Sequence, residues 1–356
     1  MSLNSDPLLS IKGLKTSFNT YDGIVNAVNG VDFDVLPGET LGLVGESGCG
    51  KSVTALSVLR LLNPAMTTIQ GEVAFDGKNL LDLDPEEMRM MRGGTISMIF
   101  QEPMTSLNPI LTIGEQIAES LRLHEKLDKK KAWKKAIQML EMVQIPSPEV
   151  RVGQYPHKLS GGMRQRAMIA MALACNPRLI FADEPTTALD VTIQAQIIRL
   201  MEHLKKGSNT SIILITHDLG VVAQMASRVV VMYAGQVVEE APVVELFHDA
   251  RHPYTKGLLK SIPVLNGDKN TRLNEIPGIV PNLLHMPKGC SFHPRCSQTM
   301  DICKKKSPPM IHFKENRRVA CWLASDNFRK KKCPEQKIKS GHAQTDQKGK
   351  QSHACT

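Results

Sequence analysis

The chain has 356 residues and a mass of 39.3 kDa, which is too long for one ordinary domain of roughly 100–200 residues. Its 42% hydrophobic and 22% charged residues can form a sizeable core, which excludes a globally disordered protein. The net charge of +9 comes from the carboxy-terminal end, because residues 304–356 hold 14 Lys and Arg against 4 Asp and Glu. We therefore expect a nearly neutral core domain, at least one appendage and a basic tail.

Short apolar runs alternate with segments of helical spacing along the first 240 residues, which is typical of an α/β domain. The apolar runs predict strands at residues 40–44, 96–100, 179–182 and 211–216. The helical spacing predicts helices at about residues 52–62 and 193–204 and a helical insertion at residues 106–158. After about Ala241 the regularity falls and prolines recur, so we place a domain boundary near this residue.

No membrane span or secretory signal is expected. The longest uninterrupted apolar run, residues 167–175, is far shorter than the ~18–20 residues that a spanning helix needs. Residues 1–18 lack a basic segment followed by an apolar one. In the reducing compartment that this implies, the five cysteines between Cys290 and Cys333 predict metal binding before disulfides.

Residues 45–52 read GESGCGKS and match the phosphate-loop pattern G-x-x-x-x-G-K-[ST], between a predicted strand and a predicted helix. The glycines let backbone N–H groups turn around phosphate oxygens, and the helix start adds the positive end of its dipole. Lys51 is expected to reach the β- and γ-phosphates, and the Ser52 hydroxyl to bind Mg²⁺. The loop residues expected to contact the nucleotide are Gly45, Ser47, Gly48, Cys49, Gly50, Lys51 and Ser52.

Two carboxylates follow the predicted strand 179–182 and complete this site. Asp183 is expected to hold the Mg²⁺ shell. Glu184 is expected to accept a proton from the attacking water, a role worth ~10²–10⁴-fold in rate. Residues 159–166 read LSGGMRQR, which predicts a second anion-binding cradle at a helix start; the alternative is a Ser helix cap with permissive glycines.

In chain order, five motifs resemble those of the nucleotide-binding subunit of ABC transporters over about residues 8–260. They are GESGCGKS, FQEPMTSLNP, LSGGMRQR, LIFADEPTTALD and the THD at residues 216–218. The resemblance implies an α/β fold: a P-loop ABC-type ATPase core with a helical subdomain and a small Cys-rich C-terminal domain. It also implies a nucleotide-binding domain at residues 1–245, with the helical subdomain at about 104–175. A permease-type C-terminal domain at 246–328 and a basic, disordered tail at 329–356 follow.

Further site residues are implied by this resemblance alone. Gln101 senses Mg²⁺ and the lytic water and couples to membrane subunits, and His217 contacts the γ-phosphate. An aromatic side chain stacks on adenine, with Phe18 and Tyr21 as the candidates. Three residues act across a dimer: Ser160 and Gly162 contact the ATP of the opposing subunit, and Asp190 lies at the dimer seam.

The carboxy-terminal sequences at residues 251–263, 276–284 and 287–296 resemble the oligopeptide and dipeptide permease branch. The implied function is ATP hydrolysis that powers oligopeptide import, with dipeptide import as the alternative. The implied partners are a second ATPase subunit, with a heterodimer favoured, two integral membrane permease subunits and an extracytoplasmic peptide-binding protein. The chain would then lie peripherally on the cytoplasmic face of the inner membrane.

An alternative of another class is a soluble ABC ATPase acting on nucleic acid. It is disfavoured, and no nucleic acid is expected, because the 108 residues between Lys51 and Ser160 are too few for a long coiled-coil arm.

Four cysteines form a compact array in the Pro-rich segment: Cys290, Cys296, Cys303 and Cys321. Four thiolates suit either zinc or an iron–sulfur cluster. The spacing lacks the C-x₂₋₄-C knuckle of structural zinc, so a 4Fe-4S cluster is favoured, and the permease resemblance implies the same. Zn²⁺ and unliganded thiols remain alternatives. The cysteines expected to be unliganded are Cys49, Cys175, Cys333 and Cys355.

Overall fold

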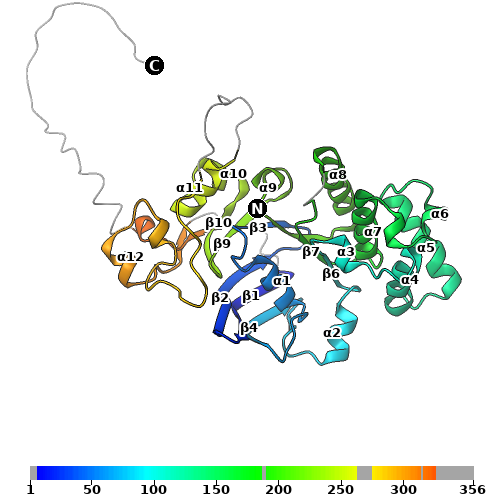
Figure 1. Ribbon diagram of the computed structural model, residues 1–356, viewed down its shortest axis with the longest axis horizontal. Coiled ribbons are helices and arrows are strands. Elements are labelled where there is room, and N and C mark those ends of the chain that lie inside the picture. Colours follow the sequence, from blue (N-terminus) through cyan, green and yellow to red (C-terminus); the bar gives the residue numbers. More distant parts are fainter. Residues whose placement is uncertain (1–5, 187–189, 263–274, 314–315, 326–356) are drawn as a thin grey trace, which may run out of the picture.

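The computed structural model describes residues 6–186, 190–262, 275–313 and 316–325. Within these residues the strands form two sheets (Figure 1). The smaller contains β1 (Leu9–Thr20), β2 (Gly23–Val35), β4 (Thr67–Phe75) and β5 (Lys78–Asn79), in the order β2-β1-β4-β5. The larger contains β3 (Thr40–Val44), β6 (Ile96–Ile99), β7 (Leu179–Asp183), β8 (Ser211–Thr216), β9 (Arg228–Tyr233), β10 (Gln236–Pro242), β11 (Ile311–Phe313) and β12 (Arg317–Val319). Its order is β11-β12-β10-β9-β3-β8-β7-β6.

The centre of the larger sheet is parallel and is buried on both faces. Strands β9, β3, β8, β7 and β6 run parallel, and β10, β12 and β11 are antiparallel additions. Along β7, Leu179 and Phe181 enter the core shared with the smaller sheet, whereas Ile180 and Ala182 enter the core shared with the helices. This alternation fills two cores from one strand, which explains why the parallel strands read as continuous apolar runs.

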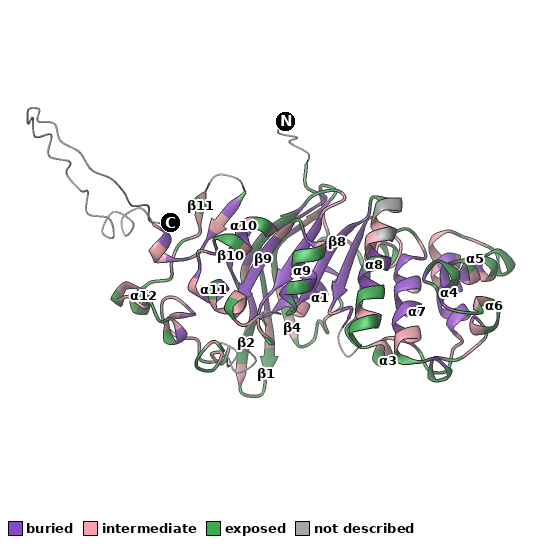
Figure 2. Ribbon diagram, turned by 90° about the horizontal axis from the view of Figure 1, so that it is seen from above, coloured by how far each residue is buried: buried purple, intermediate pink, exposed green. Residues whose placement is uncertain are grey.

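Helices cover one face of the larger sheet and extend into a lobe. The α-helices are α1 (Lys51–Val58), α2 (Pro85–Met91), α3 (Pro103–Ser106), α4 (Ile113–His124), α5 (Lys129–Met142), α6 (Pro148–Arg151), α7 (Gly161–Leu173), α8 (Val191–Ser208), α9 (Leu219–Met225), α10 (Val243–His248), α11 (Pro253–Lys260) and α12 (Asp301–Lys305). Short 3₁₀ helices are η1 (Pro156–Lys158), η2 (His293–Arg295) and η3 (Trp322–Ala324). Both views place the lobe of α4–α7 at one end of the molecule and α12 at the other (Figures 1 and 2). Buried residues run through the central strands between them (Figure 2).

The predicted α/β organisation is confirmed, with strands 40–44 and 211–216 present as β3 and β8. The predicted end of the helix at about 52–62 is wrong. Helix α1 ends at Val58, because Arg60 adopts a left-handed backbone with φ of 50°. The strand predicted at 96–100 ends at Ile99. The basic tail at 329–356 lies outside the described residues. No helix in the described ranges combines the length and apolar character needed to cross a membrane.

The carboxy-terminal residues return to the main sheet. Strand β12 pairs with β10, where Glu239 lies opposite Val319 and Glu240 opposite Arg318, and β11 extends the edge beyond β12. Residues beyond the boundary expected near Ala241 therefore share a sheet with the nucleotide-binding core. A separate small Cys-rich domain stays a prediction.

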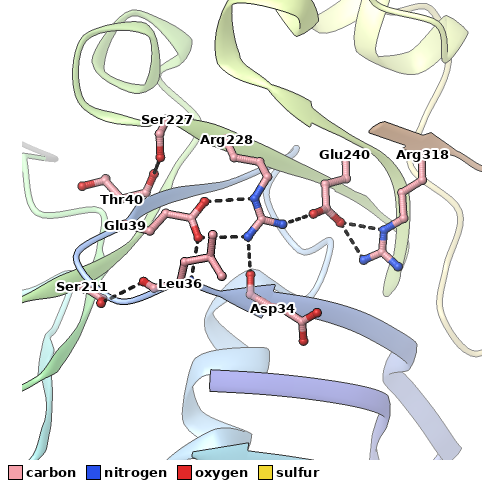
Figure 3. Close-up of polar contacts among 9 residues, drawn as sticks. All are labelled: Asp34, Leu36, Glu39, Thr40, Ser211, Ser227, Arg228, Glu240 and Arg318. Atoms are coloured by element: carbon pink, nitrogen blue, oxygen red, sulfur yellow. Dashed lines mark hydrogen bonds and ion pairs between the residues drawn. The ribbon is translucent and has the colours of Figure 1, made fainter. Parts of the chain in front are cut away.

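A buried charge network holds this junction together (Figure 3). Arg228 on β9 donates two hydrogen bonds to the Glu39 carboxylate, at 2.9 and 3.0 Å, and another to Glu240 on β10. Arg318 on β12 donates to the second oxygen of Glu240 at 2.7 Å, and Arg228 also reaches the Asp34 carbonyl on β2. The side chains of Glu39 and Glu240 are only 8% and 6% exposed, so each depends on an arginine for charge compensation.

We expect Arg228→Met to lower the free energy of unfolding by about 3–5 kcal/mol, because it leaves two buried carboxylates short of a partner. The matched control is Arg178→Met, which breaks the ion pair between Arg178 and Asp76. The side chains of these two residues are 51% and 61% exposed. It should cost far less, since water already solvates both charges. Urea unfolding followed by circular dichroism measures both; equal losses would contradict a special role for the network.

Candidate functional site

The candidate site lies where parallel strands end on one edge of the larger sheet. The phosphate loop follows β3, Asp183 ends β7, Thr216 ends β8, and Gln101 comes two residues after β6. The register of the parallel pairs places these carboxyl ends side by side. Ligands of open α/β sheets bind in the crevice outside such strand ends, so the local sequence motifs meet at the expected place.

Glycines are required at both ends of the phosphate loop. Gly45 has φ of 154°, and a Cβ there would lie 2.3 Å from the carbonyl oxygen of Met232. Gly50 has φ of 100°, and a Cβ there would lie 2.5 Å from the carbonyl oxygen of Ala27. The exposed Ser47 and Gly48 form the open part of the loop. The loop therefore packs tightly on β9 and β2 while its middle remains free to approach an anion.

The Lys51 ammonium group lies over the loop. Lys51 opens α1 and is buried, and its Nζ donates to the carbonyl oxygens of Gly45 at 2.8 Å and Glu46 at 3.0 Å. Buried Cys49 also accepts a contact from Nζ at 3.7 Å, and burial raises the pKa of its thiol. The cation is thereby held beside the positive end of a helix dipole, which favours phosphate binding.

Ser52 and Asp183 place two oxygens together across the site. The Ser52 hydroxyl donates to Asp183 Oδ1 at 3.0 Å. Burial raises the pKa of Asp183, the neighbouring Glu184 adds to this, and Ser52 and Lys51 oppose it. In the described ranges, no three His, Cys, Asp or Glu side chains lie close enough together to hold a metal ion. Mg²⁺ in nucleotide sites uses one or two protein oxygens together with phosphates and waters, so this pair fits it.

Glu184 joins the ends of three strands. Its backbone is left-handed, with φ of 46°, and its N–H donates to Ile215 on β8. Its carboxylate accepts from Gln101 Nε2 at 3.0 Å and lies 3.0 Å from His217 Nδ1. A left-handed backbone is uncommon for a non-glycine residue, and such strained positions cluster at functional sites. The structure thus brings together three of the predicted site residues.

The residues expected to act across a dimer lie at the starts of two neighbouring helices. Ser160 caps α7 by accepting from Met163 N at 3.3 Å, and Asp190 caps α8 by accepting from Ile193 N at 2.9 Å. A Cβ on Gly162 would lie 3.3 Å from Ile193, so this glycine lets the two helix starts approach. Both capping residues are exposed, and none of the hydrogen bonds found for Ser160 in the described residues reaches the phosphate loop.

The two aromatic candidates lie on the β1–β2 hairpin. Phe18 is half-buried in β1, paired with Val25 and Thr67. Tyr21 lies in the turn and is fully exposed. Both stay candidates for adenine stacking.

The Cys321 thiol lies near enough to the other three clustered cysteines for their charges to affect it. Burial, together with the charges of Cys290, Cys296 and Cys303, raises the pKa of Cys321 to about 11. Burial also raises the pKa of Cys290, whose N–H donates to the Cys303 carbonyl at 2.8 Å. No three cysteines in the described ranges approach closely enough for one metal ion, which weighs against a single Zn²⁺. Cys333 and Cys355 lie outside the described residues.

Sequence reasoning missed two residues that contact the phosphate loop. Tyr254 Oη accepts from the Glu46 N–H at 2.8 Å, and Arg295 donates to both Glu46 carboxylate oxygens at 2.6 and 2.9 Å. Tyr254 lies on α11 and Arg295 on η2, far from the loop in sequence. In the sequence, the segments that contain Tyr254 and Arg295 were notable only because they resemble the oligopeptide and dipeptide permease branch. No local spacing pattern could have connected either residue to Glu46.

Two family models match the chain. The model described as "ABC transporter" matches residues 28–187, and the model described as "Oligopeptide/dipeptide transporter, C-terminal region" matches residues 238–303. The first covers the phosphate loop, Gln101, Ser160 and the Asp183–Glu184 pair. The second spans β10 to α12, including Tyr254 and Arg295.

Similar proteins agree with both matches. The oligopeptide transport ATP-binding protein OppD of Bacillus subtilis is 53% identical over 92% of this chain and 92% of its own length. The OppD protein of Haemophilus influenzae is 50% identical over 91% of this chain and 99% of its own. A solved dimer of the ATP-binding cassette MJ0796 with ADP and Pi matches with a TM-score of 0.60 and 29% identity, over 66% of this chain and 98% of that one. The chain therefore belongs to the ATP-binding proteins of ABC transporters, in the group with an oligopeptide/dipeptide transporter C-terminal region.

Proposed function

We propose that this ABC ATPase hydrolyses ATP to power the import of oligopeptides through a membrane permease. The observation that carries the proposal is the convergence of the phosphate loop, the Ser52–Asp183 pair and Glu184 at one edge of the sheet. The peptide substrate is supported by relatives that are named oligopeptide transport ATP-binding proteins. Those names favour oligopeptides over the dipeptide alternative and transport over action on nucleic acid.

The residues divide the work on ATP. Loop N–H groups and Lys51 bind the phosphates, and Ser52 and Asp183 would hold Mg²⁺, which neutralises charge that develops on the phosphates. Glu184 accepts the proton of the attacking water, and Gln101 and His217 hold its carboxylate in position. Phe18 or Tyr21 stacks on the adenine. The hydrogen bonds to Glu184 support this division of roles.

A second ATPase subunit completes the site in this proposal. Ser160 and Gly162 then contact the ATP bound by the partner, and Asp190 lies at the dimer seam. The exposed starts of α7 and α8 and the dimeric state of MJ0796 support this arrangement. Two different ATPase subunits are favoured over two copies of this chain. The other partners are two integral membrane permease subunits and an extracytoplasmic peptide-binding protein, which place the chain peripherally on the cytoplasmic face of the inner membrane.

The four clustered cysteines are proposed to bind a 4Fe-4S cluster. This cluster would stabilise residues 246–328 as a small C-terminal domain. Around one Zn²⁺ the sulfurs would lie about 3.8 Å apart, given Zn–S bonds of ~2.3 Å. In a cluster each thiolate binds a separate iron atom, so its ligands can lie further apart. The hydrogen bond from the Cys290 N–H to the Cys303 carbonyl, at 2.8 Å, brings two of the four proposed ligands, Cys290, Cys296, Cys303 and Cys321, together and supports this assignment. The cluster would supply structural stability rather than a step of hydrolysis.

Glu184→Gln is expected to keep ATP affinity and lower the rate of ATP hydrolysis about 10²–10⁴-fold, because an amide cannot accept the proton. Glu141→Gln, on the exposed face of α5, is the matched control and should hydrolyse ATP at the normal rate. Phosphate release and equilibrium nucleotide binding measure the two effects. Near-normal turnover of Glu184→Gln would reject its role as the base.

Cys296→Ser is expected to remove most of the iron and the visible absorbance of the anaerobically purified chain. The control is Cys175→Ser, which alters a half-buried thiol two residues after α7; this thiol donates a hydrogen bond to the Ser120 carbonyl. Iron analysis and absorption spectra provide the readouts. Unchanged iron in Cys296→Ser, or zinc in place of iron in the native chain, would contradict the 4Fe-4S assignment.

A further inference from the structure

Every polar group of Glu46, the second residue of the phosphate loop, has a hydrogen-bond partner. Its N–H donates to Tyr254 Oη at 2.8 Å, and its carbonyl oxygen accepts from Lys51 Nζ at 3.0 Å. Both carboxylate oxygens accept from Arg295, at 2.6 and 2.9 Å. Two of these three partners come from the carboxy-terminal region, 208 and 249 residues away along the chain. The loop is therefore anchored from outside the nucleotide-binding motifs.

Hydrogen bonds to groups other than Glu46 also fix the orientation of the Arg295 guanidinium. Its Nε donates to the Pro277 carbonyl at 3.1 Å, and Nη2 also donates to the Ile276 carbonyl at 3.2 Å. A Cβ on Gly278, which has φ of 84°, would lie 3.2 Å from Arg295 Cγ. The arginine side chain is only 4% exposed. Such a planar, two-pronged contact depends on arginine geometry that a lysine ammonium group does not reproduce.

Tyr254 belongs to a cluster of three aromatic rings, with Tyr233 and Phe292, next to the phosphate loop. The ring centroids of Tyr254 and Tyr233 lie 4.7 Å apart, and the Phe292 ring lies 5.2 Å from Tyr233 and 5.4 Å from Tyr254. Tyr233 and Tyr254 are fully buried. Rings packed in this way have little freedom to move, so the hydroxyl that receives the Glu46 N–H is fixed in place.

The charge of Glu46 would oppose the ligand of its own loop if it were left unpaired. A nucleoside triphosphate brings several negative charges to residues 45–52, and at low effective dielectric a nearby carboxylate repels them over several ångströms. The two hydrogen bonds from Arg295 cancel this charge and leave the Lys51 cation to face the phosphates. The side-chain exposure of Glu46, 26%, means that water screens it only in part.

We propose that Arg295 is a positioning residue for the phosphate loop, which neutralises and aims Glu46 so that the loop accepts a nucleoside triphosphate. This inference rests on the proposed ATP site. It makes nucleotide affinity depend on a residue of the Cys-rich region that touches neither the nucleotide nor the water.

The test is a double-mutant cycle in the full-length chain, with the dissociation constant of ATP measured at low and high salt. Arg295→Met should weaken ATP binding about tenfold, which corresponds to about 1.4 kcal/mol. The loss should be larger at low salt, because salt screens the exposed charge. Arg295→Met with Glu46→Gln should recover most of the affinity, since the repelling charge is then gone.

Arg317→Met is the matched control. Arg317 makes a similarly buried set of ion pairs, with Glu239, Glu245 and Asp249, in the same carboxy-terminal region but away from Glu46. It should lower the melting temperature while ATP affinity stays unchanged. A purely structural role for Arg295 predicts the same pattern as Arg317→Met, with no recovery in the double variant, and that result would overturn the proposal.

Two single variants decide the matter if Arg295→Met does not fold. Arg295→Lys keeps the charge but loses the two-pronged contact, so it should weaken ATP binding by less than the about tenfold expected of Arg295→Met. Glu46→Gln should bind ATP as well as the wild-type chain or better. Weaker binding by Glu46→Gln would overturn the proposal. Failure of the wild-type chain to bind ATP would instead refute the proposed function, so the two failures are distinguishable.

Discussion

Parallel strands end on the same edge of a sheet, and this constraint determines where the chemistry of the chain can lie. Strands β3, β7 and β8 are neighbours, and β6 adjoins β7, so motifs separated by more than a hundred residues meet at one crevice. The strands hold their register because alternate residues fill two different cores, and a shift by one residue would exchange those faces. The positions of Lys51, Asp183 and Glu184 are thus consequences of core packing.

The central strands and the site could be predicted because their signals are local. The runs at 40–44 and 211–216 became strands with the predicted limits, and the loop between β3 and α1 has glycines where a Cβ would collide with backbone. Gln101 and His217 were expected in the site from the family resemblance, but their contacts with Glu184 appear only in the folded structure. Helix ends were less predictable: α1 stops four residues early at a left-handed Arg60, which no periodicity signals.

Contacts between distant segments could not be predicted from spacing. Nothing local to Arg318 indicates that it shares Glu240 with Arg228, or that β12 joins the main sheet through β10. No separate role was predicted for Arg295, which lies in a segment close to the cysteines. Its partner Glu46 lies inside the phosphate loop. These pairs depend on how the chain returns to the core after α11, which only the folded structure specifies. As a result, the Cys-rich region and the nucleotide site are mechanically joined rather than independent.

The central claim is that the edge formed by β3, β7 and β8 binds ATP with Mg²⁺ at Lys51. The most direct measurement is an equilibrium titration of the full-length chain with ATP, with and without Mg²⁺, in the wild type and in Lys51→Ala. The account predicts saturable binding that Mg²⁺ strengthens and that Lys51→Ala largely removes, because the buried ammonium group compensates the phosphate charge. Binding that ignores Mg²⁺, or that survives unchanged in Lys51→Ala, would contradict it.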